Sequence, residues 1–372
     1  MTKPKLRIGL IGTGFMGKAH VFGFTSAPRV FELPFDLELH TVADITDAAA
    51  ARAAQTLGFA HATSDWRSIM ADPEIDLVSI TAPNALHKEM SLAAIAAGKH
   101  VYCEKPLAPL ASDAREMAEA AEAKGVKTQV GFNYLCNPML GLAREMISSG
   151  ELGEIRGYRG LHAEDYMADS AGVYGFRHDP AGGGALADIG SHALATAEFL
   201  CGPISRVMGD LVTMIGERPD GKGGRKAVAV DDVGRAFLRF ENGATGSVEG
   251  NWIATGRKMQ HDFEVYGTKG ALAFSQQHFN VLNYFSTDDA KGRQGFRRIE
   301  AGPDHAPYGL FCVAAGHQLG FNDLKAIEVA RYVNAIAGKG TEPYSFRAGL
   351  RIQTLVEVIQ RSSQAGHWMD VA

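Results

Sequence analysis

The chain has 372 residues, of which 46% are hydrophobic and 21% charged, so it is long enough for two domains of an ordinary globular protein. Its formal net charge of −5 argues against a general nucleic-acid or anionic-membrane surface, because either would need a basic face. Four widely spaced cysteines predict neither a zinc module nor a disulfide framework, and no apolar run reaches the roughly 20 residues of a membrane helix, so we expect a cytoplasmic protein.

The first predicted elements are a strand, a glycine loop and a helix, in the stretch KLRIGLIGTGFMGKAH. Gly12, Gly14 and Gly17 form a G-x-G-x-x-G pattern in this context. The first glycine permits a tight turn, the second lets the backbone approach a pyrophosphate, and the third lets the helix pack closely on the strand. We therefore expect a dinucleotide site here, with Phe15 and Met16 in its loop.

The second predicted strand, DLELHTVADI, ends in Asp44, which we expect to accept hydrogen bonds from the adenosine ribose. Asp44 lies 27 residues after Gly17, more than the usual ~20, and a loop insertion over residues 28–34 would account for the difference. A carboxylate here would repel a ribose 2′-phosphate, and neither Ile45 nor Thr46 offers a cation to bind one. The sequence therefore favours NAD over NADP, with a solvated turn aspartate as the alternative.

Strands and helices continue to alternate as far as the segment VKTQVGFNY. This alternation predicts a doubly wound parallel sheet, an α/β Rossmann NAD-binding domain over residues 1–134. Ligands of such sheets lie at the carboxyl ends of the strands, so the loops GTGFMG, TAPNALH and CEKP should lie close together. The last of these loops contains a possible ion pair between Glu104 and Lys105, and we predict a cis Lys105–Pro106 peptide.

Beyond Pro138 strand-like runs follow one another, with hairpin signals at ENGA and GTKG. They predict an α+β domain over residues 135–372, an open and mostly antiparallel sheet with helices, for substrate binding and oligomerisation. The uncovered face of such a sheet favours a homodimer or homotetramer.

Between these strands the stretch GGGALADIGSH begins a predicted buried helix. Asp188 and His192 are four residues apart and so lie on one face of it. Such a pair orients the imidazole and raises its pKa, although it also occurs as an ordinary surface contact. The glycines before the helix allow another group to approach closely.

The ordered motifs GTGFMGKAH, TAPNALH, CEKPLA, GFNY and DIGSH resemble the Gfo/Idh/MocA family of sugar and polyol oxidoreductases over essentially the whole chain. The resemblance implies NAD-dependent oxidation of a secondary hydroxyl (a CH–OH donor) on a sugar, anhydrosugar, glycoside or cyclitol. It implies catalytic roles for Lys105, Asp188 and His192, with the histidine as proton acceptor, although the residues alone leave open whether Lys105 or His192 is the base. It also implies cofactor contacts beyond the glycine loop and Asp44, from Thr81, Pro83, Asn84, His87, Glu104, Lys105 and Asn133.

The substrate's ring hydroxyls are expected to meet side chains from strand ends and loops as well as the catalytic residues: Tyr134, His162, Asp165, Tyr166 and Arg177. An exposed HAEDY segment is as often only a solvated loop. No metal is expected, since no cluster of His, Cys and Asp has ligand spacing. Two other functions stay open: a non-catalytic nucleotide or sugar sensor with the same fold, and an NAD-using enzyme that cleaves glycosides. The joint presence of the three catalytic residues argues against the sensor.

Overall fold

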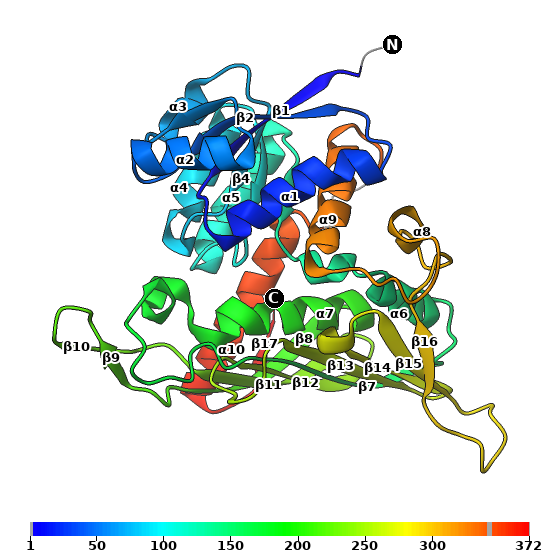
Figure 1. Cartoon of the computed structure of the whole chain (residues 1–372). Helices are drawn as coiled ribbons and strands as arrows, with labels where there is room; N and C mark the ends of the chain where they lie inside the picture. The colour runs from blue at the N-terminus through cyan, green and yellow to red at the C-terminus, as the bar shows by residue number, and fades with distance from the viewer. Residues whose placement is uncertain (1–2, 341–343, 372) are drawn as a thin grey trace. The chain divides into compact units, whose positions relative to one another are not determined.

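The computed structural model describes residues 3–340 and 344–371, which form two compact units (Figure 1). The first unit comprises Met1–Cys136 and Leu319–Arg351, and the second comprises Asn137–Gln318 and Ile352–Ala372. The segment Leu319–Arg351, expected from the sequence in the second domain, therefore belongs to the first unit. Nothing local marks this return of the chain, because the contacts that define it join residues far apart in sequence. A boundary between independently folding domains at residues 134 and 135 stays a prediction.

The first unit contains a six-stranded parallel sheet in the order β3-β2-β1-β4-β5-β6. This is the doubly wound Rossmann order, and it confirms the fold class predicted for this part of the chain. The central strands are almost continuously apolar, as strands covered on both faces must be. The strands are β1 (Lys5–Ile11), β2 (Asp36–Ala43), β3 (His61–Thr63), β4 (Leu77–Ile80), β5 (His100–Cys103) and β6 (Thr128–Val130).

The helices of the first unit are α1 (Phe15–Val30), α2 (Asp47–Leu57), α3 (Arg67–Ala71), α4 (His87–Ala96), α5 (Ala111–Lys124) and α9 (Phe321–Ile336). Helix α1 continues through Pro28, so a long helix and not a loop insertion explains the spacing to Asp44. Pro28 has no N–H, so α1 lacks one intrahelical hydrogen bond there, and the helix ends two residues later at Val30. Figure 1 shows α1 and α9 side by side. A Cβ at Gly23 of α1 would lie 2.9 Å from the carbonyl oxygen of Lys325, so the glycine permits this close packing.

The second unit contains a nine-stranded sheet in the order β16-β15-β14-β13-β7-β12-β11-β8-β17 and a separate β9–β10 hairpin. Strand β7 pairs parallel with β12 and antiparallel with β13, so the sheet is mixed but mostly antiparallel, as predicted. The strands are β7 (Ile155–Ala163), β8 (Ile204–Val212), β9 (Glu217–Pro219), β10 (Arg225–Ala227), β11 (Val233–Phe240), β12 (Thr245–Asn251), β13 (Gln260–Gly267), β14 (Gly270–Ser275), β15 (Val281–Ser286), β16 (Arg297–Glu300) and β17 (Met369–Asp370).

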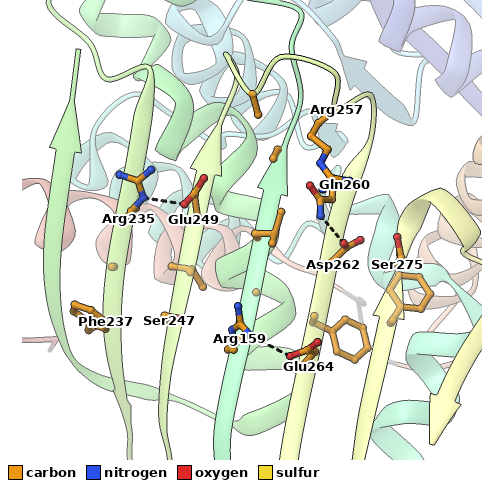
Figure 2. A pocket seen from close by; sticks show the side chains of 18 of the residues that line it. Arg159, Arg235, Phe237, Ser247, Glu249, Arg257, Gln260, Asp262, Glu264 and Ser275 are labelled. Carbon is orange, nitrogen blue, oxygen red and sulfur yellow. Dashed lines mark hydrogen bonds and ion pairs between the residues drawn. The ribbon is translucent and has the colours of Figure 1, made fainter. Parts of the chain in front are cut away.

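One face of this sheet is covered by helices and the other is open. Along β11, Ala236 and Leu238 are buried against the helices, while Arg235 and Phe237 point to the open face. Figure 2 shows the open face, where Arg235 and Glu249 lie on neighbouring strands. The remaining helices are α6 (Pro138–Ser148), α7 (Ser191–Cys201), α8 (Tyr308–Phe311) and α10 (Phe346–Ala365), which begins in the first unit and ends in the second.

Helix α7 is preceded directly by a π-helical turn over Leu186–Gly190. The sequence predicts one continuous helix here, so the wider turn is a departure from that prediction. A Cβ at Gly250 of β12 would lie 2.9 Å from the Cα of Gly190, so the strand packs on the turn by backbone contact. Single π turns occur frequently at functional sites.

Candidate active site

The glycine loop of the first unit has the geometry of a dinucleotide site. Gly12 has φ = +92°, and a Cβ there would lie 3.0 Å from the carbonyl of Thr81. A Cβ at Gly17 would lie 2.3 Å from the carbonyl oxygen of Gly12, whereas one at Gly14 would meet nothing within 4 Å. No side chain caps α1 at Gly14, so the first N–H groups of the helix are available to an anion. The loop therefore fits a pyrophosphate. Phe15 is largely exposed at the start of the helix.

Asp44 follows β2. One side-chain donor and one backbone donor hold its carboxylate. The Thr13 hydroxyl donates to Oδ2, and the Ile45 N–H donates to Oδ1 at 2.7 Å. Each oxygen keeps a second lone pair that can accept a hydrogen bond from a ribose hydroxyl. Ile45 is 90% exposed and brings no positive charge to the position. This arrangement fits the ribose of NAD.

The loops after β4 and β5 lie together, as the sequence predicts. The His87 ring bridges them, with Nε2 at 2.8 Å from the Ala82 carbonyl oxygen and Nδ1 at 2.9 Å from that of Pro106. Burial lowers the pKa of His87, so its neutral ring donates to one of these carbonyls at a time. His87 is fully buried and supports the two loops, while a direct contact with NAD stays a prediction. The Lys105–Pro106 peptide is cis, as predicted, and Lys105 is half-buried.

Three further predicted cofactor residues line the same strand ends. The Thr81 hydroxyl donates to the Gly12 carbonyl at 2.8 Å and joins the β4 loop to the glycine loop. Pro83 is exposed, and Asn84, the first residue of the 3₁₀ turn that follows, is buried. Asn133, after β6, is buried, and its Nδ2 has no hydrogen-bond partner among residues 3–340 and 344–371. A buried amide hydrogen without an acceptor is costly, which makes Asn133 a candidate ligand contact.

Glu104 has different partners from those expected. Its carboxylate, 5% exposed, lies 2.8 Å from Lys325 Nζ and 2.8 Å from His20 Nε2. The expectation that Lys105 is its counter-ion is therefore incomplete, since a fully buried lysine 221 residues later supplies that charge. A role for Glu104 towards the nicotinamide ribose stays a prediction.

In the second unit Asp188 and His192 are both buried, at 6% and 5% exposure. Asp188 lies in the π turn and His192 in the first turn of α7. Two residues predicted to contact substrate hold the carboxylate: Tyr166 donates its hydroxyl to Oδ2 at 2.8 Å, and Arg177 donates Nε–H to the same oxygen at 2.9 Å. The geometry therefore gives Tyr166 and Arg177 a contact that the sequence does not reveal.

The other predicted substrate residues are spread over both units. The His162 ring centroid lies 5.5 Å from that of His192, and its Nε2 lies 2.9 Å from Glu164 Oε1. Asp165 pairs at the surface with Lys258 at 2.7 Å. In the first unit the Tyr134 ring packs 6.1 Å from Phe321.

Comparison with known proteins agrees with this geometry. Residues 6–132 match the oxidoreductase family with an NAD-binding Rossmann fold, and residues 141–273 match the GFO/IDH/MocA C-terminal domain. The chain is 38% identical over 384 residues to levoglucosan dehydrogenase from Pseudarthrobacter phenanthrenivorans, with 98% of each chain covered. The chain belongs to the Gfo/Idh/MocA family. As a family member it is an NAD-binding oxidoreductase, which confirms the predicted family, cofactor and enzyme class.

Another relative and a solved structure extend this comparison. The chain is 28% identical over 288 residues to scyllo-inositol 2-dehydrogenase (NAD(+)) from Bacillus subtilis, with 75% of this chain and 77% of that one covered. A solved structure of levoglucosan dehydrogenase in complex with NADH and levoglucosan has a TM-score of 0.95, at 38% identity and 99% coverage of both chains. In the described part of this family member, no helix has the length and apolar character needed to span a membrane.

Two site-forming groups of this Gfo/Idh/MocA chain are missed by sequence reasoning. His261 of β13 pairs across the sheet with His162, and their ring centroids lie 5.0 Å apart. Asp231 accepts the Leu186 N–H at 2.8 Å and so caps the start of the π turn. A Cβ at Gly184 would lie 2.2 Å from Asp231 Oδ1. The run of glycines does signal a close approach, but no local pattern identifies the aspartate that makes it.

Proposed function

We propose that this Gfo/Idh/MocA protein oxidises a secondary hydroxyl on a sugar, anhydrosugar, glycoside or cyclitol to a ketone. NAD, when bound, supplies the hydride acceptor. The named relatives are dehydrogenases of levoglucosan and of scyllo-inositol, two ring compounds that carry secondary hydroxyls. The observation that carries the proposal is the burial of Asp188 and His192 on successive turns, with the carboxylate held by Tyr166 and Arg177.

His192 is suited to remove the hydroxyl proton, because an imidazole is the side chain that changes charge near neutral pH. The Arg177 guanidinium pairs with the Asp188 carboxylate and offsets part of its charge. Lys105, as a cation, would stabilise the developing alkoxide. The variants Lys105→Ala and His192→Ala, described below, test which of the two residues is the base.

The experiment is a panel of pyranoses, anhydrosugars, glycosides and inositols incubated with NAD and followed by absorbance at 340 nm. We expect NADH formation with at least one ring polyol, and we expect the product, once purified, to be the corresponding ketone. A sensor would bind nucleotide without any absorbance change, and a glycoside-cleaving enzyme would release sugar without net NADH. Lys105→Ala and His192→Ala should each lower kcat by about 100-fold or more with the affinity for NAD nearly unchanged. Near-normal turnover in either variant would remove that residue from the mechanism.

We further propose that the protein associates through the open face of the nine-stranded sheet into a homodimer or homotetramer. Phe237 projects from this face and is 61% exposed. Charges of both signs lie on the same face, including Arg235 with Glu249 and Arg159 with Glu264 (Figure 2). A face with both signs can be complementary to a second copy of itself about a two-fold axis.

We also propose a reducing, cytoplasmic compartment. All four cysteines carry free thiols, and Cys103, Cys136 and Cys201 are buried. Burial raises the pKa of the Cys136 and Cys201 thiols to about 12, so neither is a reactive thiolate.

A further inference from the structure

Five ionisable side chains form a cluster in the core of the first unit, and the proposed reaction assigns a chemical step to none of them. This buried charge network consists of His20 from α1, Tyr102 from β5, Glu104 from the loop after β5, and Lys325 and Glu328 from α9. All five are at most 5% exposed, and four of them are fully buried. Burying a charge is costly unless it is paired, so a cluster of this kind requires a reason.

The Lys325 ammonium is satisfied completely within the network. Its Nζ lies 2.8 Å from Glu104 Oε1, 2.9 Å from the Tyr102 hydroxyl oxygen and 3.0 Å from Glu328 Oε2. An ammonium has three N–H donors, and each has one oxygen acceptor here. The two carboxylates raise the pKa of Lys325 despite its burial, and the pKa of Glu104 is lowered by Lys325 and His20. Lys325 and Glu104 therefore form a charged pair.

His20 joins this pair to the elements of the cofactor site. Its Nε2 lies 2.8 Å from Glu104 Oε1 and its Nδ1 lies 2.8 Å from the Ser79 hydroxyl. Burial, and then the charge of Lys325, lowers the pKa of His20 to about 4, so the ring is neutral. Since an ionised carboxylate only accepts, Nε2 carries the proton and Nδ1 accepts from Ser79. The network thus connects α1, which follows the glycine loop, with β4 and the loop after β5.

The Glu104 carboxylate is also held against the backbone on both sides. Its Oε2 accepts the backbone N–H of Lys105 at 3.2 Å. A Cβ at Gly131 would lie 2.5 Å from Oε1, so the carboxylate occupies the space that the glycine leaves. The position of the Lys105 backbone is therefore tied to a carboxylate whose own position depends on Lys325.

We propose that Lys325 is a positioning residue for Lys105, acting through Glu104. Lys325 fixes the charge and the orientation of the Glu104 carboxylate, and the carboxylate fixes the start of the loop from which the Lys105 side chain projects. This inference rests on the proposed function only in assigning Lys105 to the reaction. The contacts themselves belong to the core of the first unit.

The test compares the pH dependence of kcat in the wild type and in Lys325→Met. Without the ammonium the pKa of Glu104 rises, so protonation of Glu104 should begin at a higher pH. We therefore expect the pH profile of kcat to gain a new decline on its acidic side (an acidic limb), in which kcat falls at least tenfold towards the lowest pH. The titratable groups that face Glu104 are His20, His87, Tyr102, Cys103, Lys325 and Glu328. The double variant Lys325→Met/Glu104→Gln identifies the titrating group, because the new limb should vanish in it.

Lys99→Met is the matched control. Lys99 is another buried lysine of the first unit, and it donates to the carbonyls of Asp72 and Ile75 without touching Glu104. The substitution Lys99→Met should lower the stability of the protein without adding a new limb to the pH profile of kcat. Unchanged profiles in both lysine variants, or the same limb in both, would overturn the proposal.

A second measurement separates this inference from the proposed function. Hydrogen exchange followed by mass spectrometry reports the protection of the Lys105 amide without any turnover. We expect faster exchange at Lys105 in folded Lys325→Met than in the wild type or Lys99→Met. If the wild type oxidises no polyol but the exchange changes as expected, the proposed function fails and the positioning role stands. Unaltered exchange at Lys105 would refute the positioning role whatever the enzyme oxidises.

Discussion

The surroundings of two buried carboxylates of this protein shift their pKa values in opposite directions. Glu104 faces the ammonium of Lys325 and is held ionised. Asp231 is equally buried, but its carboxylate accepts from backbone N–H groups such as that of Leu186 and faces no ammonium in these contacts, and its neighbour Asp232 adds a second negative charge. Burial therefore raises the pKa of Asp231 to about 6. The difference shows that the partner, and not burial itself, decides the charge of these side chains.

Asp231→Asn tests this charge through stability. The folded protein binds the Asp231 proton more tightly than the unfolded chain, whose pKa is near 3.8, so wild-type stability falls as the pH rises from about 4 to about 6. Asparagine can still accept the Leu186 N–H but does not titrate. Relative to the wild type, the variant should gain up to about 3 kcal/mol of unfolding free energy between pH 4 and pH 7. Urea unfolding at a series of pH values measures this gain, and parallel curves for the two proteins would contradict it.

The substitution Gly184→Ala tests the close approach of the Asp231 carboxylate to the backbone before the π turn. Its φ of +76° disfavours a side chain, and a Cβ would also lie 2.2 Å from Asp231 Oδ1. Gly243 is the matched control in the same unit, with φ = +88° and nothing within 4 Å of its Cβ position. We expect Gly243→Ala to cost about 1 kcal/mol of unfolding free energy and Gly184→Ala to cost ~3 kcal/mol or more. Equal losses in urea unfolding would show that the cap on the π turn is unimportant.

The residues of the site differ in how far the sequence reveals them. Gly12, Gly14 and Gly17 follow a local pattern with a physical role for each position, and the structure gives each of them the expected space. His20 and Lys325 are missed, because they are 305 residues apart and each looks like an ordinary helix residue. Only the packing of α1 on α9 makes them neighbours.

At the scale of elements, we predict that the end of β2 determines the choice between the two nicotinamide cofactors. Replacing Asp44 by serine removes the charge that repels a 2′-phosphate, and replacing the exposed Ile45 by arginine supplies a cation for it. A hydrogen bond to a charged group contributes about 1.5–3 kcal/mol, so the ratio of kcat/KM for NADP over NAD should rise by about 10- to 100-fold. Ile45→Gln, which adds no charge, is the control. If the ratio of kcat/KM for NADP over NAD is unchanged in the double variant, Asp44 is not the residue that contacts the ribose.

The order and type of the elements follow from hydrophobic patterning, while their ends and pairings do not. Alternating strands and helices in the first part of the chain predict the parallel sheet. The length of α1 is mispredicted because a proline usually ends a helix, whereas α1 continues two residues past Pro28. The π turn over Leu186–Gly190 is invisible to periodicity, since it depends on the backbone contact between Gly190 and Gly250.

At the scale of the whole molecule, the open sheet face predicts self-association. Phe237→Glu would place a charge on that face, and a two-fold interface built on the face would have to bury that charge in both copies. Light scattering after gel filtration should then report a smaller assembly than for the wild type, with the fold of each subunit unchanged by circular dichroism. Lys222→Glu, on the exposed turn between β9 and β10 (Figure 1), is a control outside the face and should leave the mass unchanged. A monomeric wild type, or an unaltered mass for Phe237→Glu, would exclude the sheet as the interface.

The return of the chain to the first unit at Leu319 has a consequence for synthesis on the ribosome. A nascent chain that has emerged as far as Cys136 already contains every strand of the parallel sheet and the whole glycine loop. It also contains Glu104, but the ammonium that neutralises this buried carboxylate is still about 190 residues from being made. The nucleotide-binding unit therefore completes its core only after Asn137–Gln318 of the second unit has been translated, and we expect competence to hold NAD to arise late, when α9 leaves the exit tunnel.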